Sequence, residues 1–182
     1  MSSEFPEPSL RRWHHSPPHL FLPGAHHIVT CGTRWKKRMF ECESRLSLVQ
    51  STLFDQADRL SWLLEAWAVL PNHFHFVARA PEDAMTLTRL IQGVNSITAR
   101  RINAEDKTPG RQVWFRYWDT CLTNRESYFA RLNYVHQNPV RHGMVVSAED
   151  YPWCSMSWFM ERAPGEMQRT VSSFKIDSVK VM

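Results

Sequence analysis

The chain has 182 residues, of which 43% are hydrophobic and 22% charged, and its formal net charge at pH 7 is +4. This length fits one domain with a substantial core, and the composition is that of a globular protein. No apolar run approaches the roughly 20 residues that a membrane-spanning helix needs, so we expect no membrane association. Residues 1–18 lack the apolar stretch of a secretory signal and contain Pro17 and Pro18, which predicts a flexible leader.

The cysteines of the chain are widely separated and form no Cys-x-x-Cys pair. They are Cys31, Cys42, Cys121 and Cys154. This spacing argues against a compact zinc knuckle and shows no disulfide framework of a secreted protein. We therefore expect reduced thiols in a cytoplasmic protein.

Hydrophobic periodicity and turn residues predict the order strand, helix, strand, strand, helix, strand, helix. The expected strands are residues 26–33, 61–70, 73–79 and 113–122, and the expected helices are 41–56, a segment from Leu87 to about Asn103, and one that follows Thr123. Pro71 and Asn72 supply the central residues of a tight turn between the second and third strands. Thr123 and Glu126 resemble a capping box that opens the last helix.

This order predicts a ferredoxin-like, RRM-like α+β fold. Its antiparallel sheet would carry helices on one face, and an extra C-terminal helix would follow. In that topology the first and third strands are neighbours at the centre of the sheet. Residues 26–33 should therefore lie beside residues 73–79.

His73 and His75 are two positions apart on a predicted strand. Side chains of a strand alternate between its faces, so both imidazoles should share one face, about 6.6 Å apart at the backbone. That spacing lets two ring nitrogens converge on one cation, while Phe74 points to the packed face. Taken alone, the pattern is more often that of partly exposed surface histidines.

Tyr134 lies on the last predicted helix, about 100° around the helical wheel from its apolar stripe. The stripe consists of Tyr128, Leu132 and Val135. Tyr134 shares its side with Arg131 and Asn138, which suggests a functional cluster, although a boundary tyrosine at the sheet edge would show the same pattern. Because Asn138 precedes Pro139, the helix should end or bend there and aim the Asn138 amide towards Tyr134; an ordinary helix stop is the alternative.

Two groups of basic residues suit a single strand of nucleic acid, whose phosphates attract cations and whose unpaired bases stack on flat rings. The first group is Arg34, Lys36, Lys37 and Arg38; in the second, Arg111 and Arg116 bracket Trp114 and Phe115. The alternative is a solvated loop beside a half-buried strand.

Several of these motifs occur together, in order, in one known family. His73-Phe74-His75 after Pro71-Asn72, followed by the run from Tyr134 to Gly143, closely resembles the HUH single-tyrosine transposases, and most of all their REP-associated tyrosine transposases. The strand at His27–Thr30 and the ending Tyr151-Pro-Trp153 are similar to that family too. The resemblance covers roughly residues 19–160, which we expect to form the catalytic domain, and leaves 161–182 as a tail.

The resemblance implies that His73, His75 and Asn138 bind a divalent metal ion, Mg²⁺ or Mn²⁺, and that Tyr134 is the nucleophile. Tyr134, His73 and His75 would then be the catalytic residues. Some branches of the family have glutamine at the last ligand position, so Asn138 favours the REP-associated branch. Residues expected to contact DNA are Arg34, Lys36, Lys37, Arg38, Arg116 and Arg131.

The expected function is that of a metal-dependent endonuclease and strand transferase. It would act on single-stranded DNA with hairpins or palindromic repeats, through a 5′-phosphotyrosine intermediate, as a monomer or homodimer near the bacterial nucleoid. One alternative is a non-catalytic single-stranded nucleic-acid-binding protein of the same fold. Another is a zinc hydrolase that combines His73 and His75 with His26 or His27 and has no need of Tyr134.

Overall fold

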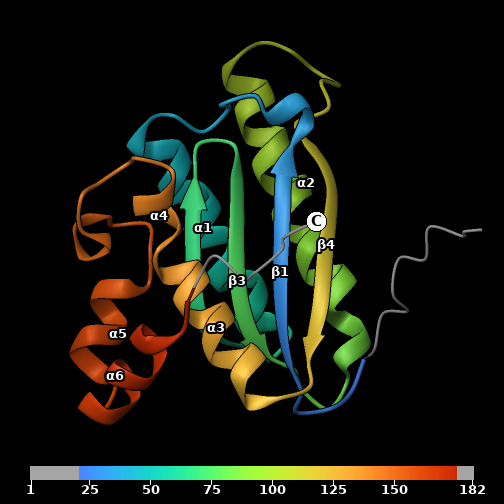
Figure 1. Ribbon diagram of the computed structural model, residues 1–182. Coiled ribbons are helices and arrows are strands. Elements are labelled where there is room, and N and C mark those ends of the chain that lie inside the picture. Colours follow the sequence, from blue (N-terminus) through green and yellow to red (C-terminus); the bar gives the residue numbers. More distant parts are fainter. Residues whose placement is uncertain (1–20, 176–182) are drawn as a thin grey trace, which may run out of the picture.

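The structure, a computed structural model, describes residues 21–175, so the expected leader lies outside the described residues. One four-stranded antiparallel sheet forms its centre, in the order β2-β3-β1-β4 (Figure 1). The strands are β1 (His26–Thr33), β2 (Leu63–Leu70), β3 (His73–Arg79) and β4 (Trp114–Leu122). The helices are α1 (Glu43–Arg59), α2 (Leu87–Glu105), α3 (Arg125–His136), α4 (Asn138–Arg141), α5 (Met156–Arg162) and α6 (Gly165–Ser173).

The predicted ferredoxin-like topology is confirmed, with β1 and β3 as the central pair. Both of these strands begin and end at the expected residues, and the turn of Pro71 and Asn72 joins β2 to β3. The expected capping box at the start of α3 is wrong. The N-cap is Asn124, whose side-chain oxygen accepts a hydrogen bond from the Ser127 backbone N–H, so Thr123 lies outside the helix.

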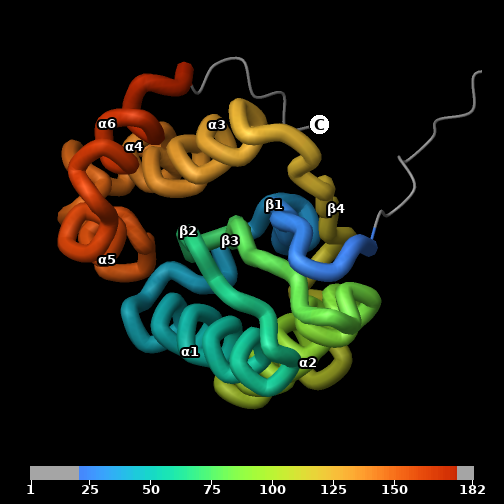
Figure 2. Tube along the Cα trace, turned by 90° about the horizontal axis from the view of Figure 1, so that it is seen from below, coloured from blue at the N-terminus to red at the C-terminus, as the bar shows by residue number. Residues whose placement is uncertain are grey.

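The two faces of the sheet are covered by different helices (Figure 2). On one face, α1 and α2 pack against alternate strand residues, among them Phe74 and Phe76 of β3, which are fully buried. This arrangement follows from the period of two in a strand, because the residues between them must face the other way. His73 and His75 therefore project from the opposite face.

That opposite face is only partly covered. The segment from α3 to α6 lies over β2 and β3 (Figures 1 and 2). The core between this segment and the sheet includes Ala68, Leu70 and Val77. On β4 the large side chains of Phe115 and Trp118 remain about half exposed. The extra helix carrying Tyr134 thus stands beside an open stretch of sheet.

The expected boundary between domain and tail at residue 160 falls inside α5. Beyond it, α6 packs on α3, burying Val171, and the Asn133 side-chain N–H₂ donates to the Phe174 carbonyl at 2.8 Å. Residues up to 174 therefore belong to the same packed body. Within the described part of the chain, no helix is both long and apolar enough to cross a membrane.

All four cysteines are free thiols, as the sequence predicts. Cys31 and Cys154 are buried, and burial raises the pKa of each thiol to about 12. At neutral pH both stay protonated and behave as small apolar core residues.

Candidate active site

The turn between β2 and β3 places His73 and His75 on the open side of the sheet. Their ring centroids are 4.8 Å apart, and we call these two residues the histidine pair. His75 is 2% exposed and lies under Tyr134, so it also contributes to packing, whereas His73 is partly exposed. The expected common face is confirmed.

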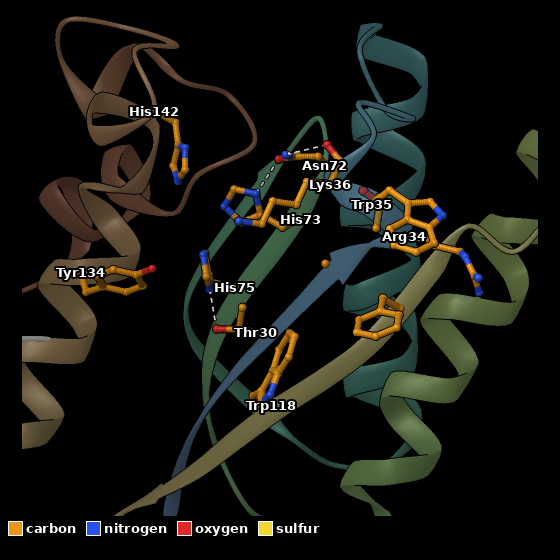
Figure 3. Close-up of a pocket in the computed structure, with 13 residues that line it drawn as sticks. Thr30, Arg34, Trp35, Lys36, Asn72, His73, His75, Trp118, Tyr134 and His142 are labelled. Atoms are coloured by element: carbon orange, nitrogen blue, oxygen red, sulfur yellow. Dashed lines mark hydrogen bonds between the residues drawn. The ribbon is translucent and has the colours of Figure 1, made fainter. Parts of the chain in front are cut away.

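Each histidine of the pair is oriented through its Nδ1 atom (Figure 3). His73 Nδ1 lies 2.7 Å from the Asn72 side-chain oxygen, and His75 Nδ1 lies 2.8 Å from the Thr30 hydroxyl. The amide of Asn72 is held by its own N–H₂, which donates to the Lys36 carbonyl at 3.2 Å. Because the Asn72 oxygen can only accept, His73 carries its hydrogen on Nδ1 and presents a lone pair at Nε2. Metal-binding histidines are commonly held in this way.

Asn138 meets the histidine pair from the other side. Its side-chain oxygen lies 3.1 Å from His73 Nε2, and the residue is fully buried. Burial lowers the pKa of His73 to about 4, so the ring is neutral at pH 7 and two acceptor atoms face each other. Two ligands at right angles on one cation, each with a bond of about 2.1 Å, would be about 3.0 Å apart. The spacing therefore fits a shared divalent ion.

The donor set that fits such an ion is two imidazole nitrogens and one amide oxygen. Among residues 21–175, no group of three or more His, Cys, Asp or Glu side chains is arranged to hold a metal. A residue of another type, Asn138, is the one whose side-chain oxygen faces the histidine pair. Burial and the neighbouring His73 keep the pKa of His75 well below its usual value, so its ring is also neutral at pH 7.

The geometry contradicts the zinc-hydrolase alternative. His27 faces the opposite side of the sheet, fully buried against Trp62 at 5.6 Å between ring centroids. His26 is four residues from Thr30, or about 13 Å along the strand, and its Nδ1 contacts the Glu65 carboxylate at 2.8 Å. Neither ring reaches the histidine pair.

Tyr134 faces the histidine pair from α3, with its ring centroid 5.2 Å from that of His75 (Figure 3). Its side chain is 7% exposed, so the expectation that it lies off the packed face is wrong. The reason is that the Tyr134 ring packs on His75 of the sheet, while the Arg141 guanidinium of α4 lies over the ring. Tyr134 still borders a cavity of about 520 Å³, which it shares with the histidine pair.

Opposing influences act on the Tyr134 hydroxyl. Burial raises its pKa, while a hydrogen bond with Asn138 and the charges of Arg141 and Arg131 lower it. The Arg141 guanidinium lies 5.3 Å from the centre of the Tyr134 ring, and Arg131 is half-buried one turn earlier on α3. These two cations can stabilise a phenolate or a phosphate at this position.

The other tyrosines of the chain, which has four in all, are engaged elsewhere. The Tyr117 hydroxyl is 3.0 Å from the Thr88 hydroxyl, and Tyr151 donates to the Val69 carbonyl at 3.0 Å. Burial and Glu65 raise the pKa of Tyr128. Of the four, Tyr134 is the one that borders the cavity with the histidine pair.

The expected DNA-contacting residues divide into three groups. Arg34 and Lys36 line the cavity, and Arg131 stands beside Tyr134. Lys37 and Arg116 are exposed outside the cavity lining. Arg38 is exposed but forms an ion pair with Glu41 at 2.6 Å, which reduces its availability to phosphate.

The second basic group is mostly structural. Arg111 forms an ion pair with Asp106 at 2.6 Å, and Trp114 is buried, stacking on Phe40 at 4.8 Å between centroids. For Arg111 and Trp114 these contacts favour the alternative to nucleic-acid binding, a structural role beside a half-buried strand. Phe115, on the other face of β4, is exposed as expected.

The sequence pattern did not single out several cavity residues. They are Thr30, Trp35, Asn72, Trp118 and His142, to which the nearby Arg141 can be added. Alternation along β1 could have indicated Thr30, whereas the face of Trp118 depends on an irregularity in the β1–β4 register that alternation does not show. The positions of Arg141 and His142 depend on the bend at Asn138, which no periodicity shows.

Comparison with known proteins identifies the family. A family model described as "Transposase IS200 like" matches residues 24–138. The chain belongs to this family. Two curated relatives are the REP-associated tyrosine transposase of Escherichia coli K12, 25% identical over 91 residues, and a putative REP-associated tyrosine transposase of Haemophilus influenzae Rd, 26% identical over 99 residues. The alignments cover 50% of this chain, and 52% and 56% of those proteins, so the chain spans about half the length of the curated relatives it matches.

A solved structure shares the fold of this chain. It is that of a REP-associated tyrosine transposase bound to a REP hairpin, with a TM-score of 0.67 and 19% identity, over 81% of this chain and 86% of that one. The family match spans the histidine pair and Tyr134 and ends at Asn138. Arg141 and His142 lie beyond it.

Proposed function

We propose that this IS200-like transposase cuts and rejoins single-stranded DNA, with Tyr134 as nucleophile and with the histidine pair and Asn138 as ligands of Mg²⁺ or Mn²⁺. The observation that carries the proposal is the position of Tyr134. It is the tyrosine that borders the cavity, and its ring packs on one histidine of a pair whose other member faces the Asn138 oxygen. Residues 21–174 supply all of these parts as one catalytic domain.

Free tyrosine has a pKa near 10 and is about 0.1% ionised at pH 7, a shortfall of roughly 4 kcal/mol. Burial of Tyr134 adds to that cost, and Arg141 and Arg131 offset part of it. A divalent cation held by the histidine pair and Asn138 would supply a Lewis acid that polarises the scissile phosphate. Mixed nitrogen and oxygen ligands suit magnesium or manganese under cellular supply, although imidazoles by themselves favour the later metals.

In the cleavage step, the Tyr134 oxygen forms a bond to phosphorus while the bond from phosphorus to the 3′ oxygen breaks. The proton of the hydroxyl ends on the departing 3′ oxygen, which becomes a free 3′ hydroxyl. The 5′ phosphate stays attached to Tyr134, and Arg141 stands over the ring to balance its charge. Because the new ester keeps the phosphate activated, a second 3′ hydroxyl can reverse the step and join a new strand.

The proposed substrate is a single strand that folds into a hairpin. The structural relative is bound to a REP hairpin, and this chain shares its fold. A single strand also suits the cavity, whose lining combines Arg34 and Lys36 with aromatic rings.

The test uses end-labelled single strands carrying the short palindromes that flank the gene, incubated with full-length protein and Mn²⁺. We expect cleavage and a protein–DNA adduct stable in denaturing gels, both abolished by chelator and restored by Mn²⁺ or Mg²⁺. Cleavage without an adduct would contradict the tyrosine mechanism. Tight binding without cleavage in any metal would favour the non-catalytic binding protein.

A further inference from the structure

Three aromatic side chains on the rim of the cavity are exposed to solvent. Trp35 is 75% exposed, Phe115 52% and Trp118 48%, yet all three line the cavity that holds the histidine pair. Large exposed rings gathered in one place commonly mark a binding surface, because contact between apolar rings and water is unfavourable until a partner covers them. None of the three has a role in the chemistry proposed for Tyr134.

The backbone holds Trp35 in this exposed position. Trp35 and Lys36 have φ values of 60° and 53°, in the left-handed region that bulky residues rarely adopt. Hydrogen bonds fix the turn on both sides: the Arg34 N–H donates to the Val113 carbonyl at 2.8 Å, and the Thr33 hydroxyl donates to the Lys37 carbonyl at 2.7 Å. Such strain persists where the surrounding structure enforces it, and it is concentrated at functional sites.

Positive charge accompanies these rings. The Arg34 guanidinium packs over Trp35 at 5.0 Å from the ring centre and donates to the Gln112 side chain, while Lys36 lines the same cavity. Figure 3 shows Trp35 and Trp118 on one side of the histidine pair and Tyr134 on the other. Rings beside cations match a single strand, whose unpaired bases offer flat faces next to phosphates; paired and stacked bases of a duplex cannot offer them.

We propose that Trp35, Phe115 and Trp118 form a base-stacking cradle. It takes unpaired DNA bases adjacent to the phosphate at Tyr134, and Arg34 and Lys36 hold the intervening backbone. This inference rests on the proposed function for the position of the strand relative to Tyr134. It adds that the protein binds the unpaired strand by stacking on the bases of that strand, in addition to any contact with a hairpin.

The test measures binding in chelator with Tyr134→Phe protein, so that no cleavage can occur. The probes are a fluorescent thymidine 12-mer and an abasic 12-mer of equal charge. We expect Trp35→Ala and Trp118→Ala each to weaken thymidine 12-mer binding by about 5- to 150-fold, as loss of one stacked base does, and to change abasic binding less than about twofold. Trp35→Phe, which keeps a ring, should retain most of the affinity.

Two controls separate stacking from charge and from folding. Trp158→Ala removes a tryptophan that is 40% exposed on α5, outside the cavity, and should leave both affinities unchanged. Arg34→Gln should flatten the salt dependence of binding, whereas Trp35→Ala should shift affinity at every salt concentration without changing the slope.

Equal losses of affinity for the thymidine and abasic strands would overturn the cradle, as would an equal loss in Trp158→Ala. A uridine 12-mer bound about tenfold more tightly than the thymidine strand would overturn the choice of DNA. Failure of the proposed function is distinguishable, because it appears as absent cleavage by wild-type protein, whereas these measurements concern binding alone.

Discussion

Replacing Tyr134 by phenylalanine tests the catalytic proposal most directly. The change deletes the one oxygen proposed to attack phosphorus and keeps a ring that is 7% exposed and packed on His75. The variant loses the hydrogen bond with Asn138, worth about 1 kcal/mol, which would lower the melting temperature by about 2–4 °C for a protein of this size. It should therefore remain folded at assay temperature.

The expected loss of covalent chemistry is complete. No other tyrosine hydroxyl borders the cavity, since Tyr117 and Tyr151 are hydrogen-bonded elsewhere. Metal affinity and hairpin affinity should stay within about fivefold of wild type, because the phenol oxygen is not among the proposed ligands and the one lost hydrogen bond is worth about 1 kcal/mol.

The assay is denaturing electrophoresis of wild type and Tyr134→Phe after incubation with end-labelled hairpin strand and Mn²⁺. Wild type should give a band shifted by attached DNA, and the variant none. An adduct that survives in the variant would refute the assignment, and peptide mapping would then identify the residue responsible. Unchanged cleavage without an adduct would show that water is the nucleophile.

Four other variants test the remaining parts of the site. His73→Ala should abolish cleavage and weaken Mn²⁺ binding measured by calorimetry, because one of two imidazole ligands is gone. Asn138→Ala should weaken Mn²⁺ affinity more than DNA affinity, and excess metal should restore part of the cleavage rate, since an amide is the weaker ligand. Neutralising the basic loop at residues 34–38 should weaken single-strand binding and flatten its salt dependence, because fewer phosphates are then neutralised by the protein and fewer counterions are released. His136→Phe should flatten the pH dependence of stability: burial lowers the His136 pKa from 6.5 to about 4, so wild type should lose about 3 kcal/mol as the pH falls from 6.5 to 4.

Each of these expectations has a contrary outcome. Full cleavage in chelator would show that the reaction needs no metal. If added metal does not change the cleavage rate of Asn138→Ala, Asn138 only ends the helix and is not a metal ligand. If the salt dependence of single-strand binding is unchanged, residues 34–38 form a solvated loop that does not contact phosphates. For His136, urea titrations between pH 4 and 7 should show wild type weakening towards acid and His136→Phe doing so less; equal slopes would contradict the assignment.

The fold was predictable because each strand and helix has a clear local pattern of apolar side chains and turn residues. β1 and β3 lie at the expected residues, since a hydrophobic pattern marks both strands and the turn at Pro71 and Asn72 fixes the start of β3. The α3 cap was misassigned by one residue because Thr123, Asn124 and Glu126 offer competing capping side chains, and only the entry path of the chain chooses among them.

Strand alternation and the family resemblance predicted part of the candidate site. Alternation put His73 and His75 on one face, and the resemblance supplied Asn138 and Tyr134 as their companions. The burial of Tyr134 was not predictable, because a helical wheel does not show that His75 of the sheet and Arg141 of α4 cover the ring. The distinction between buried Trp114 and exposed Phe115 likewise depends on which face of β4 the helices cover.

The amino-acid sequence by itself determined which residues alternate, where turns occur and therefore the order of strands and helices, because these depend on neighbours along the chain. Tertiary structure alone decided the 3.1 Å approach of Asn138 to His73, the position of Arg141 over Tyr134 and the exposure of Trp35. Each of these depends on segments far apart in sequence, whose relative positions are set by how the layers pack together. Local propensity carries no information about that packing.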